Sequence, residues 1–139
     1  MSHPAGLPDL FIDRSLGRKK APAILRGAGL RLKTLAEVYG VPADQGIQDV
    51  EWLERAGTEG WTVFMKDAAI ATNPAEIAAV KAFAVRCFTL VRQDIAAHRM
   101  AAWFLNSLDE IVVACGRPGP FVYAVEETGS TRRSGESGL

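Results

Sequence analysis

The 139-residue sequence has few of the residues on which disulfides and zinc sites depend, with only two cysteines and two histidines. Cys87 and Cys115 each lie within an apolar run, so we expect two small buried side chains rather than a disulfide or a metal framework. Neither His3 nor His98 has a cysteine or a second histidine at the spacing of a zinc site. The sequence therefore predicts neither a disulfide-stabilised fold nor a zinc protein.

Net charge and long apolar runs are also missing. Sixteen Lys and Arg residues balance sixteen Asp and Glu residues, so no bulk positive field attracts the molecule to nucleic acid. No apolar stretch of about 20 residues is present, and the N-terminus lacks the basic-then-apolar order of a secretory signal. We therefore predict a cytoplasmic protein that does not bind membranes, in which any contact with nucleic acid comes from local groups of basic residues.

The sequence does contain enough apolar material for one core. Hydrophobic residues make up 48% of the chain and charged residues 23%, and a chain of this length forms one ordinary domain. We place this domain at residues 1–126. Residues 127–139 are rich in Gly, Ser, Thr and Arg, a composition that predicts a disordered C-terminal tail.

Short apolar runs alternate with helical patterns along the chain. Strands are expected at residues 10–12, 30–38, 61–65, 85–91 and 121–125, the last being a candidate edge strand, and helices at 17–27, 47–56, 73–83 and 93–115. This alternation predicts an α/β fold in which helices cover a mainly parallel sheet.

Basic and acidic residues are segregated along the chain. Residues 14–33 include seven basic residues and no acidic one, whereas residues 37–67 include seven acidic residues and two basic ones. Two explanations fit this segregation equally well. The charged residues form two solvated faces, or the basic residues form a phosphate-binding patch beside an acidic site.

Three acidic residues fall where an open parallel sheet binds its ligands, at the carboxyl ends of strands and the adjoining helix starts. Asp13 follows the first strand, Asp67 follows the third, and Asp49 lies in the first turns of a helix. Such a cluster repels itself unless a cation is present, and Mg²⁺ prefers oxygen ligands of this kind. Considered alone, an acid at the position of Asp49 is more often an ordinary helix-start residue than a metal ligand, and Asp13 is equally well explained as a cap of the following helix.

The order of four motifs resembles the PIN-like domains of VapC-type toxins. These motifs are Phe11-Ile-Asp-Arg-Ser-Leu-Gly, Leu25-Arg-Gly-Ala-Gly-Leu, Asp49-Val-Glu-Trp-Leu and Gly60-Trp-Thr-Val-Phe-Met-Lys-Asp, and the likeness covers about the first 90 residues. The resemblance implies a three-layer α/β/α sandwich, a ribonuclease that depends on Mg²⁺ or Mn²⁺, and an antitoxin partner encoded beside it. It assigns the family's acids to Asp13, Asp49 and Asp67.

The chain departs from the longer PIN pattern at its fourth acid. The fourth strand is followed by Asp94 only after Arg92 and Gln93, which leaves Glu51 or Glu37 as substitutes. Glu51 lies two residues from Asp49, so the two side chains point to different faces of a helix.

From these residues we expect metal-dependent cleavage of RNA by water, with no protein nucleophile. Asp13, Asp49 and Asp67 are the expected catalytic residues and metal ligands, with Glu51 as a further ligand. The expected phosphate contacts are Arg14, Arg18, Lys19, Lys20 and Lys66. A homodimer is left open.

Two other functions were weighed. A catalytically weak PIN-like binding module would use the apolar helix at residues 93–115 as an interaction surface through Trp103, Phe104 and Leu108, unless these side chains fill the core. A phosphoacceptor receiver domain needs a second acid beside Asp13 and a lysine after a late strand. Arg14 follows Asp13 and no lysine lies after Lys81, which argues against a receiver domain.

Overall fold

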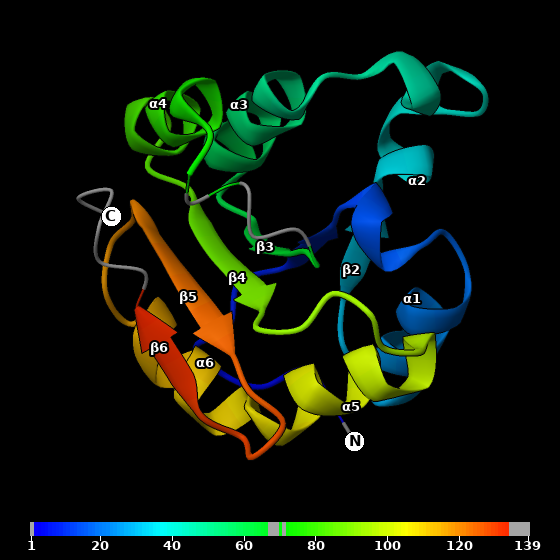
Figure 1. Cartoon of the computed structure of the whole chain (residues 1–139), viewed down its shortest axis with the longest axis vertical. Helices are drawn as coiled ribbons and strands as arrows, with labels where there is room; N and C mark the ends of the chain where they lie inside the picture. The colour runs from blue at the N-terminus through cyan, green and yellow to red at the C-terminus, as the bar shows by residue number, and fades with distance from the viewer. Residues whose placement is uncertain (1, 67–69, 71, 134–139) are drawn as a thin grey trace.

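The computed structural model describes residues 2–66, 70 and 72–133 and contains one six-stranded sheet (Figure 1). The strand order is β2-β1-β3-β4-β5-β6, with the first five strands parallel and β6 antiparallel to β5. The strands are β1 (Leu10–Ile12), β2 (Leu32–Thr34), β3 (Thr62–Phe64), β4 (Arg86–Leu90), β5 (Phe121–Val125) and β6 (Thr131–Arg133).

Helices cover both faces of the sheet, as Figure 1 shows. The α-helices are α1 (Lys20–Gly27), α2 (Leu35–Tyr39), α3 (Asp49–Glu59), α4 (Pro74–Ala82), α5 (Ala97–Asn106) and α6 (Leu108–Cys115), and two 3-10 turns are η1 (Arg14–Leu16) and η2 (Ala43–Gly46). Residues of α3 and α4 pack in one apolar cluster, and residues of α1, α5 and α6 pack in another. The predicted three-layer α/β/α sandwich is confirmed.

Alternating side chains of the strands supply the two cores. Phe11 stacks between Trp52 and Trp61 on the α3 face, at ring-centroid distances of 5.2 and 5.8 Å. Phe64 points to the opposite face and stacks on Phe104 of α5 at 4.2 Å. Because strand side chains alternate between faces, Asp13 follows Phe11 on the side of the sheet that carries α3.

The strand order reverses at β1, because β2 is added on one side of β1 and all later strands are added on the other side. The chain passes from β1 to β2 on one side and then crosses to β3 on the other, and Ile12 is aligned with Thr34 and with Phe64. The carboxyl ends of these three strands therefore meet at one edge. In open α/β sheets, a reversal of this kind opens the crevice in which ligands bind.

Several predicted elements have different limits. The strand expected at 30–38 ends at Thr34, because Thr34 and Glu37 form a reciprocal capping box that starts α2. The helix expected at 93–115 is interrupted at Ser107, whose hydroxyl donates to the carbonyl of Trp103 at 2.8 Å. The helix start predicted at Asn73 is confirmed, with its side chain accepting from the amides of Ala75 and Glu76.

The C-terminal end of the sheet also differs from expectation. β5 was a candidate edge strand, but β6 pairs with it through residues 131–133, so this part of the predicted tail is ordered. Residues 134–139 lie outside the described residues. Trp103, Phe104 and Leu108 are all buried, so the exposed interaction surface that the binding-module alternative required is not formed by them.

Candidate functional site

Asp13 is a buried acid at the carboxyl edge of the sheet. It follows β1 directly, its side chain is only 4% exposed, and its backbone amide donates to the carbonyl of Phe64 in β3. The Oδ2 atom accepts a hydrogen bond from the amide of Ser15 at 3.3 Å, whereas the buried Oδ1 atom has no partner among the described residues. A buried carboxylate oxygen without a donor is unfavourable, and a bound cation would satisfy it.

The electrostatic environment of Asp13 also favours a bound cation. Burial raises the pKa of this carboxyl, the nearby charge of Asp49 raises it further, and hydrogen bonds from Ser15 oppose the rise. Burial and a like charge both disfavour ionisation. A divalent cation between Asp13 and Asp49 would reverse this penalty, because it interacts favourably with both ionised carboxylates.

Asp49 is held in place by the packing of α3. It is the first residue of the helix, and its Oδ1 accepts from the indole Nε1 of Trp52 at 2.9 Å. Trp52 is fully buried and stacks on Phe11, two residues before Asp13. The stacking of Trp52 on Phe11 therefore packs α3 against β1 and positions Asp49 near the end of that strand.

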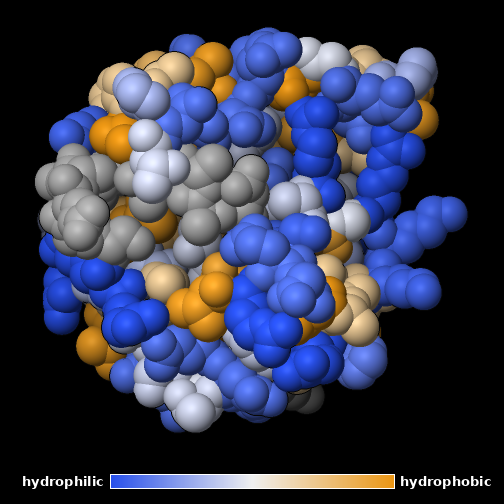
Figure 2. All heavy atoms as spheres, viewed as in Figure 1, coloured by the Kyte–Doolittle hydropathy of each residue, from blue (hydrophilic) through white to orange (hydrophobic). Residues whose placement is uncertain are grey.

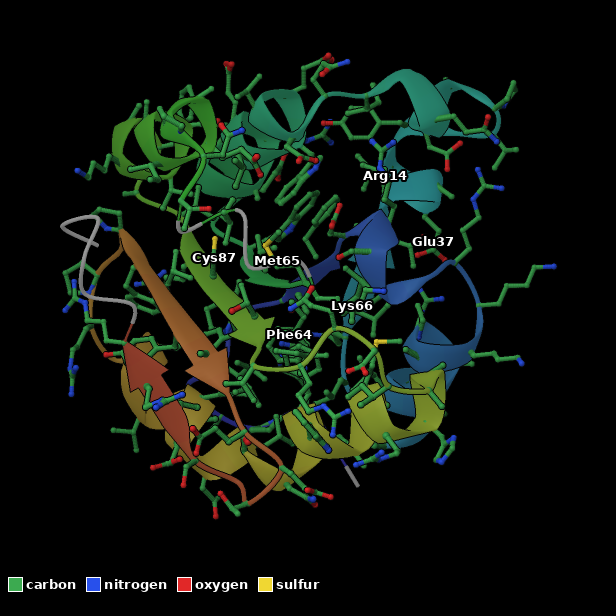
Figure 3. All side chains as sticks on the ribbon, viewed as in Figure 1. Arg14, Glu37, Phe64, Met65, Lys66 and Cys87 are labelled. Atoms are coloured by element: carbon green, nitrogen blue, oxygen red, sulfur yellow. The ribbon has the colours of Figure 1, made fainter. Side chains whose placement is uncertain are left out.

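Ser15 links Asp13 to the end of β3. Its amide donates to Asp13, and its hydroxyl accepts from the amide of Lys66 at 2.9 Å. Figure 3 shows Lys66 at the end of β3, with Cys87 on the adjacent strand β4. Asp67, the third predicted acid, lies outside the described residues. The motif that contains Ser15 assigned it no role, because its contact with the amide of Lys66 joins residues 51 positions apart in the chain.

Glu51 and Glu37 have structural roles at helix starts. Glu51 accepts from the amide of Gln48 and completes the capping box of α3. Glu37 accepts from the amide of Thr34 and forms an ion pair with Arg26, and these contacts lower the pKa of Glu37. Both residues were expected as substitutes for a missing acid.

Asp94, the acid that follows the fourth strand, is paired as well. It forms an exposed ion pair with Arg92. Among residues 2–66, 70 and 72–133, no group of three or more His, Cys, Asp or Glu side chains is placed to hold a metal ion.

Glu76 is an acid at the start of α4, where its backbone amide donates to the capping side chain of Asn73. It lies half-buried in the first turn of α4. The thiol of Cys87 is fully buried, and its pKa is raised by burial first and then by the charges of Asp13 and Glu76. Glu76 therefore lies on the same side of the sheet as Asp13, and Cys87 is a buried structural residue as predicted.

Two arginines expected to bind phosphate hold the protein's own backbone and side chains. Arg14 donates to the carbonyls of Gln45 and Ile47. Arg18 donates through Nε and Nη2 to Oδ2 of Asp44 at 3.1 and 2.6 Å, and Asp44 is 3% exposed. Both arginines follow Asp13 in the chain, and both bind residues of the segment that precedes Asp49. They therefore hold the segment after Asp13 against the segment before Asp49.

Comparison with known proteins agrees with this geometry. A family model described as "PIN like domain" matches residues 8–92, from the residues before β1 to those after β4. VapC45 of Mycobacterium tuberculosis (strain ATCC 25618 / H37Rv), whose curated name describes a proposed ribonuclease, is 41% identical over 121 residues. That match covers 87% of this chain and 88% of the mycobacterial protein.

No solved structure matches the chain significantly. In the described part of the chain, no helix is both long enough and apolar enough to span a membrane. The family model covers more than half of the sequence, and the mycobacterial relative aligns with most of it. The chain therefore belongs to the PIN-like domain family, as a domain of the VapC type.

Proposed function

We propose that the protein is an endoribonuclease that hydrolyses RNA with the help of a divalent cation. The observation that carries the proposal is the buried Asp13 carboxylate, which has one oxygen without a donor and lies close to a second acid, Asp49, at the reversal point of the sheet. The name of the mycobacterial relative agrees with this chemistry.

The proposed ligands of the cation are Asp13, Asp49 and Asp67, and we add Glu76 as the fourth acid in place of Glu51. Mg²⁺ or Mn²⁺ suits such a set, because hard cations prefer carboxylate oxygens and keep water and phosphate oxygens in their remaining positions. When bound, such an ion lowers the pKa of water and stabilises negative charge that develops on the phosphate.

The chain's own residues prepare this site. Ser15 fixes the orientation of Asp13, and Trp52 fixes that of Asp49. Lys66 lies half-buried at the end of β3, next to Ser15, and its ammonium is a candidate contact for the substrate phosphate. Lys19 and Lys20 are the other lysines predicted to contact phosphate, and both are exposed.

The proposed biological role is that of the toxin in a toxin-antitoxin pair in the cytoplasm. The VapC-type resemblance and the relative support this role, and they imply that a partner antitoxin restrains the nuclease. A homodimer stays an open prediction.

The proposal is tested by RNA cleavage and by direct metal binding. Asp13→Asn and Asp49→Asn are expected to abolish cleavage and to weaken Mn²⁺ binding measured by titration calorimetry, because each removes a negative ligand. Glu54→Gln, an exposed carboxylate on the same helix as Asp49, is the control and is expected to change neither. Cleavage that survives both Asp substitutions or excess EDTA would contradict the proposal.

A further inference from the structure

Two cavities adjoin each other beside η1, the start of α1 and the start of α5. The first, of about 430 Å³, is lined by residues 14–20 together with Ala97 and Met100. The second, of about 470 Å³, is lined by Lys20, Ile24, Ala96, Ala97 and His98. The two cavities share Lys20 and Ala97 where α1 packs against α5, and we refer to them together as the groove.

The lining of this groove is rich in basic side chains, of which Arg18 is paired with Asp44 and the two lysines are unpaired among the described residues. No acidic residue is among its described lining residues, in a protein whose formal net charge is zero. Lys19, Lys20 and His98 are exposed, and within the described part of the chain their side chains form no hydrogen bond or ion pair. The edge of the molecule beside α1 presents long hydrophilic side chains (Figure 2).

The arginines of the groove behave differently from its lysines. Arg14 and Arg18 are bound to the segment before α3, so they form a wall of fixed shape. Lys19, the N-cap residue of α1, and Lys20, its first residue, are instead exposed to solvent. Ala97, Met100 and Ile24 provide apolar surface between the cationic groups.

One end of the groove lies next to the candidate metal site in the chain, since it begins at Arg14, the residue after Asp13. Arg14 and Ser15 line it there, and Ser15 is the residue that contacts both Asp13 and the amide of Lys66. A chain that places one phosphate at Asp13 can therefore continue along the groove towards Lys20 and His98.

We propose that this groove holds the sugar-phosphate backbone of the RNA strand on one side of the scissile bond, with Lys19, Lys20 and His98 as the phosphate contacts. The inference rests on the proposed ribonuclease function and specifies how its substrate lies. A single-stranded nucleic acid fits a positively charged groove because its phosphates follow the cations. An acidic peptide of a partner protein is the competing occupant.

The test measures binding of a fluorescein-labelled oligouridylate of about 12 nucleotides by fluorescence anisotropy. The full-length Asp13→Asn variant serves as the background, since it prevents cleavage during the titration. The Lys19→Ala/Lys20→Ala double variant is compared with Lys33→Ala/Lys81→Ala, which removes two exposed lysines from β2 and α4. Thermal unfolding of each variant confirms that the fold is retained.

We expect the groove variant to weaken binding and to lower the slope of log K against log salt. Each lost phosphate contact removes about 0.7 from that slope for a single strand, so two lysines account for about 1.4 between about 50 and 200 mM salt. His98→Gln is expected to weaken binding further, and the Lys33/Lys81 variant to keep the original slope.

Three results would overturn the proposal. The groove variant can retain the affinity and slope of the control, or it can lose affinity with an unchanged slope, which excludes phosphate contacts. Alternatively, poly-glutamate can bind more tightly than the oligouridylate in a manner that depends on Lys19 and Lys20, which assigns the groove to an acidic protein segment. Because the assay requires no cleavage, the two proposals fail separately. Unchanged binding by the groove variant overturns this inference and leaves the ribonuclease standing, whereas an inactive wild-type protein overturns the ribonuclease and, with it, the placement of a scissile bond beside the groove.

Discussion

The indole of Trp52 donates a hydrogen bond of 2.9 Å to the carboxylate of Asp49, one helical turn earlier in α3. The same indole is fully buried and stacks on Phe11 of β1. One side chain therefore joins the packing of a helix on the sheet to the orientation of an acid at the candidate metal site.

Trp52→Phe is expected to keep most of the stacking on Phe11 and to remove the donor to Asp49. A hydrogen bond to a charged group contributes about 1.5–3 kcal/mol, so Mn²⁺ affinity measured by titration calorimetry is expected to fall about tenfold. Trp61→Phe is the matched control, because Trp61 stacks on the same Phe11 ring at 5.8 Å without contacting an acid in the described part of the chain. Equal losses in both variants would show that packing alone matters.

Asp13 is expected to destabilise the metal-free protein at neutral pH. Its pKa in the folded protein is raised above the usual 3.8, mainly by burial and next by Asp49. The folded state thus binds more protons than the unfolded state between these two pKa values, and stability falls as pH rises through that window. Above the folded pKa the loss is complete.

Asp13→Asn is therefore expected to raise the melting temperature of the metal-free protein at pH 7. The difference from wild type is expected to shrink as the pH is lowered below 3.8, the usual pKa of this carboxyl, where Asp13 is protonated in both the folded and the unfolded state. Added Mn²⁺ should stabilise the wild type and not the variant. A wild type that melts above Asp13→Asn at pH 7 without metal would contradict the role assigned to the buried charge.

Glu76→Gln is expected to weaken Mn²⁺ binding and to slow RNA cleavage, because it removes one of the four proposed carboxylates while preserving side-chain volume. The fold should be retained, since Asn73 provides the cap of α4. Glu51→Gln is the informative comparison: its carboxylate belongs to the capping box of α3, so this variant is expected to alter stability slightly and leave metal affinity unchanged. The opposite ranking of the two variants would restore Glu51 as the ligand.

Arg18→Ala is expected to destabilise the fold by about 2 kcal/mol, because it leaves the buried Asp44 carboxylate without its charged partner. Asp44 already has one buried oxygen without a partner. In a double-mutant cycle followed by urea unfolding, Arg18→Ala/Asp44→Ala should lose less than the sum of the single variants, with a coupling of about 1–3 kcal/mol.

The exposed Arg55–Glu59 pair of α3 provides the control for that cycle. Exposed pairs contribute at most about 1 kcal/mol, so its coupling should be small. Additive losses at Arg18 and Asp44 would mean that the ion pair does not brace the segment before Asp49.

The identities of the strands and most helices could be predicted because their signals are local. Leu10–Ile12, Phe121–Val125 and the Asn73 helix start have apolar runs or capping residues within a few positions of one another. The strand was predicted to continue past Thr34 because α2 has only five residues, which is too short for an apolar pattern of helical period to be recognised. The capping box of Thr34 and Glu37 was therefore the only local sign of this helix. β6 was missed because its stability comes from pairing with β5.

The sequence by itself determined that acids would follow buried strands at the carboxyl edge of a parallel sheet, since burial periodicity and strand direction are encoded residue by residue. Only the tertiary structure decided what surrounds those acids. The hydroxyl of Ser15 accepts a hydrogen bond from the amide of Lys66, and the indole of Trp52 donates one to Asp49. Arg18 forms an ion pair with Asp44. These contacts join segments that are distant in the chain, or they orient a side chain through packing. They are therefore formed and stabilised only once the core has brought the segments together.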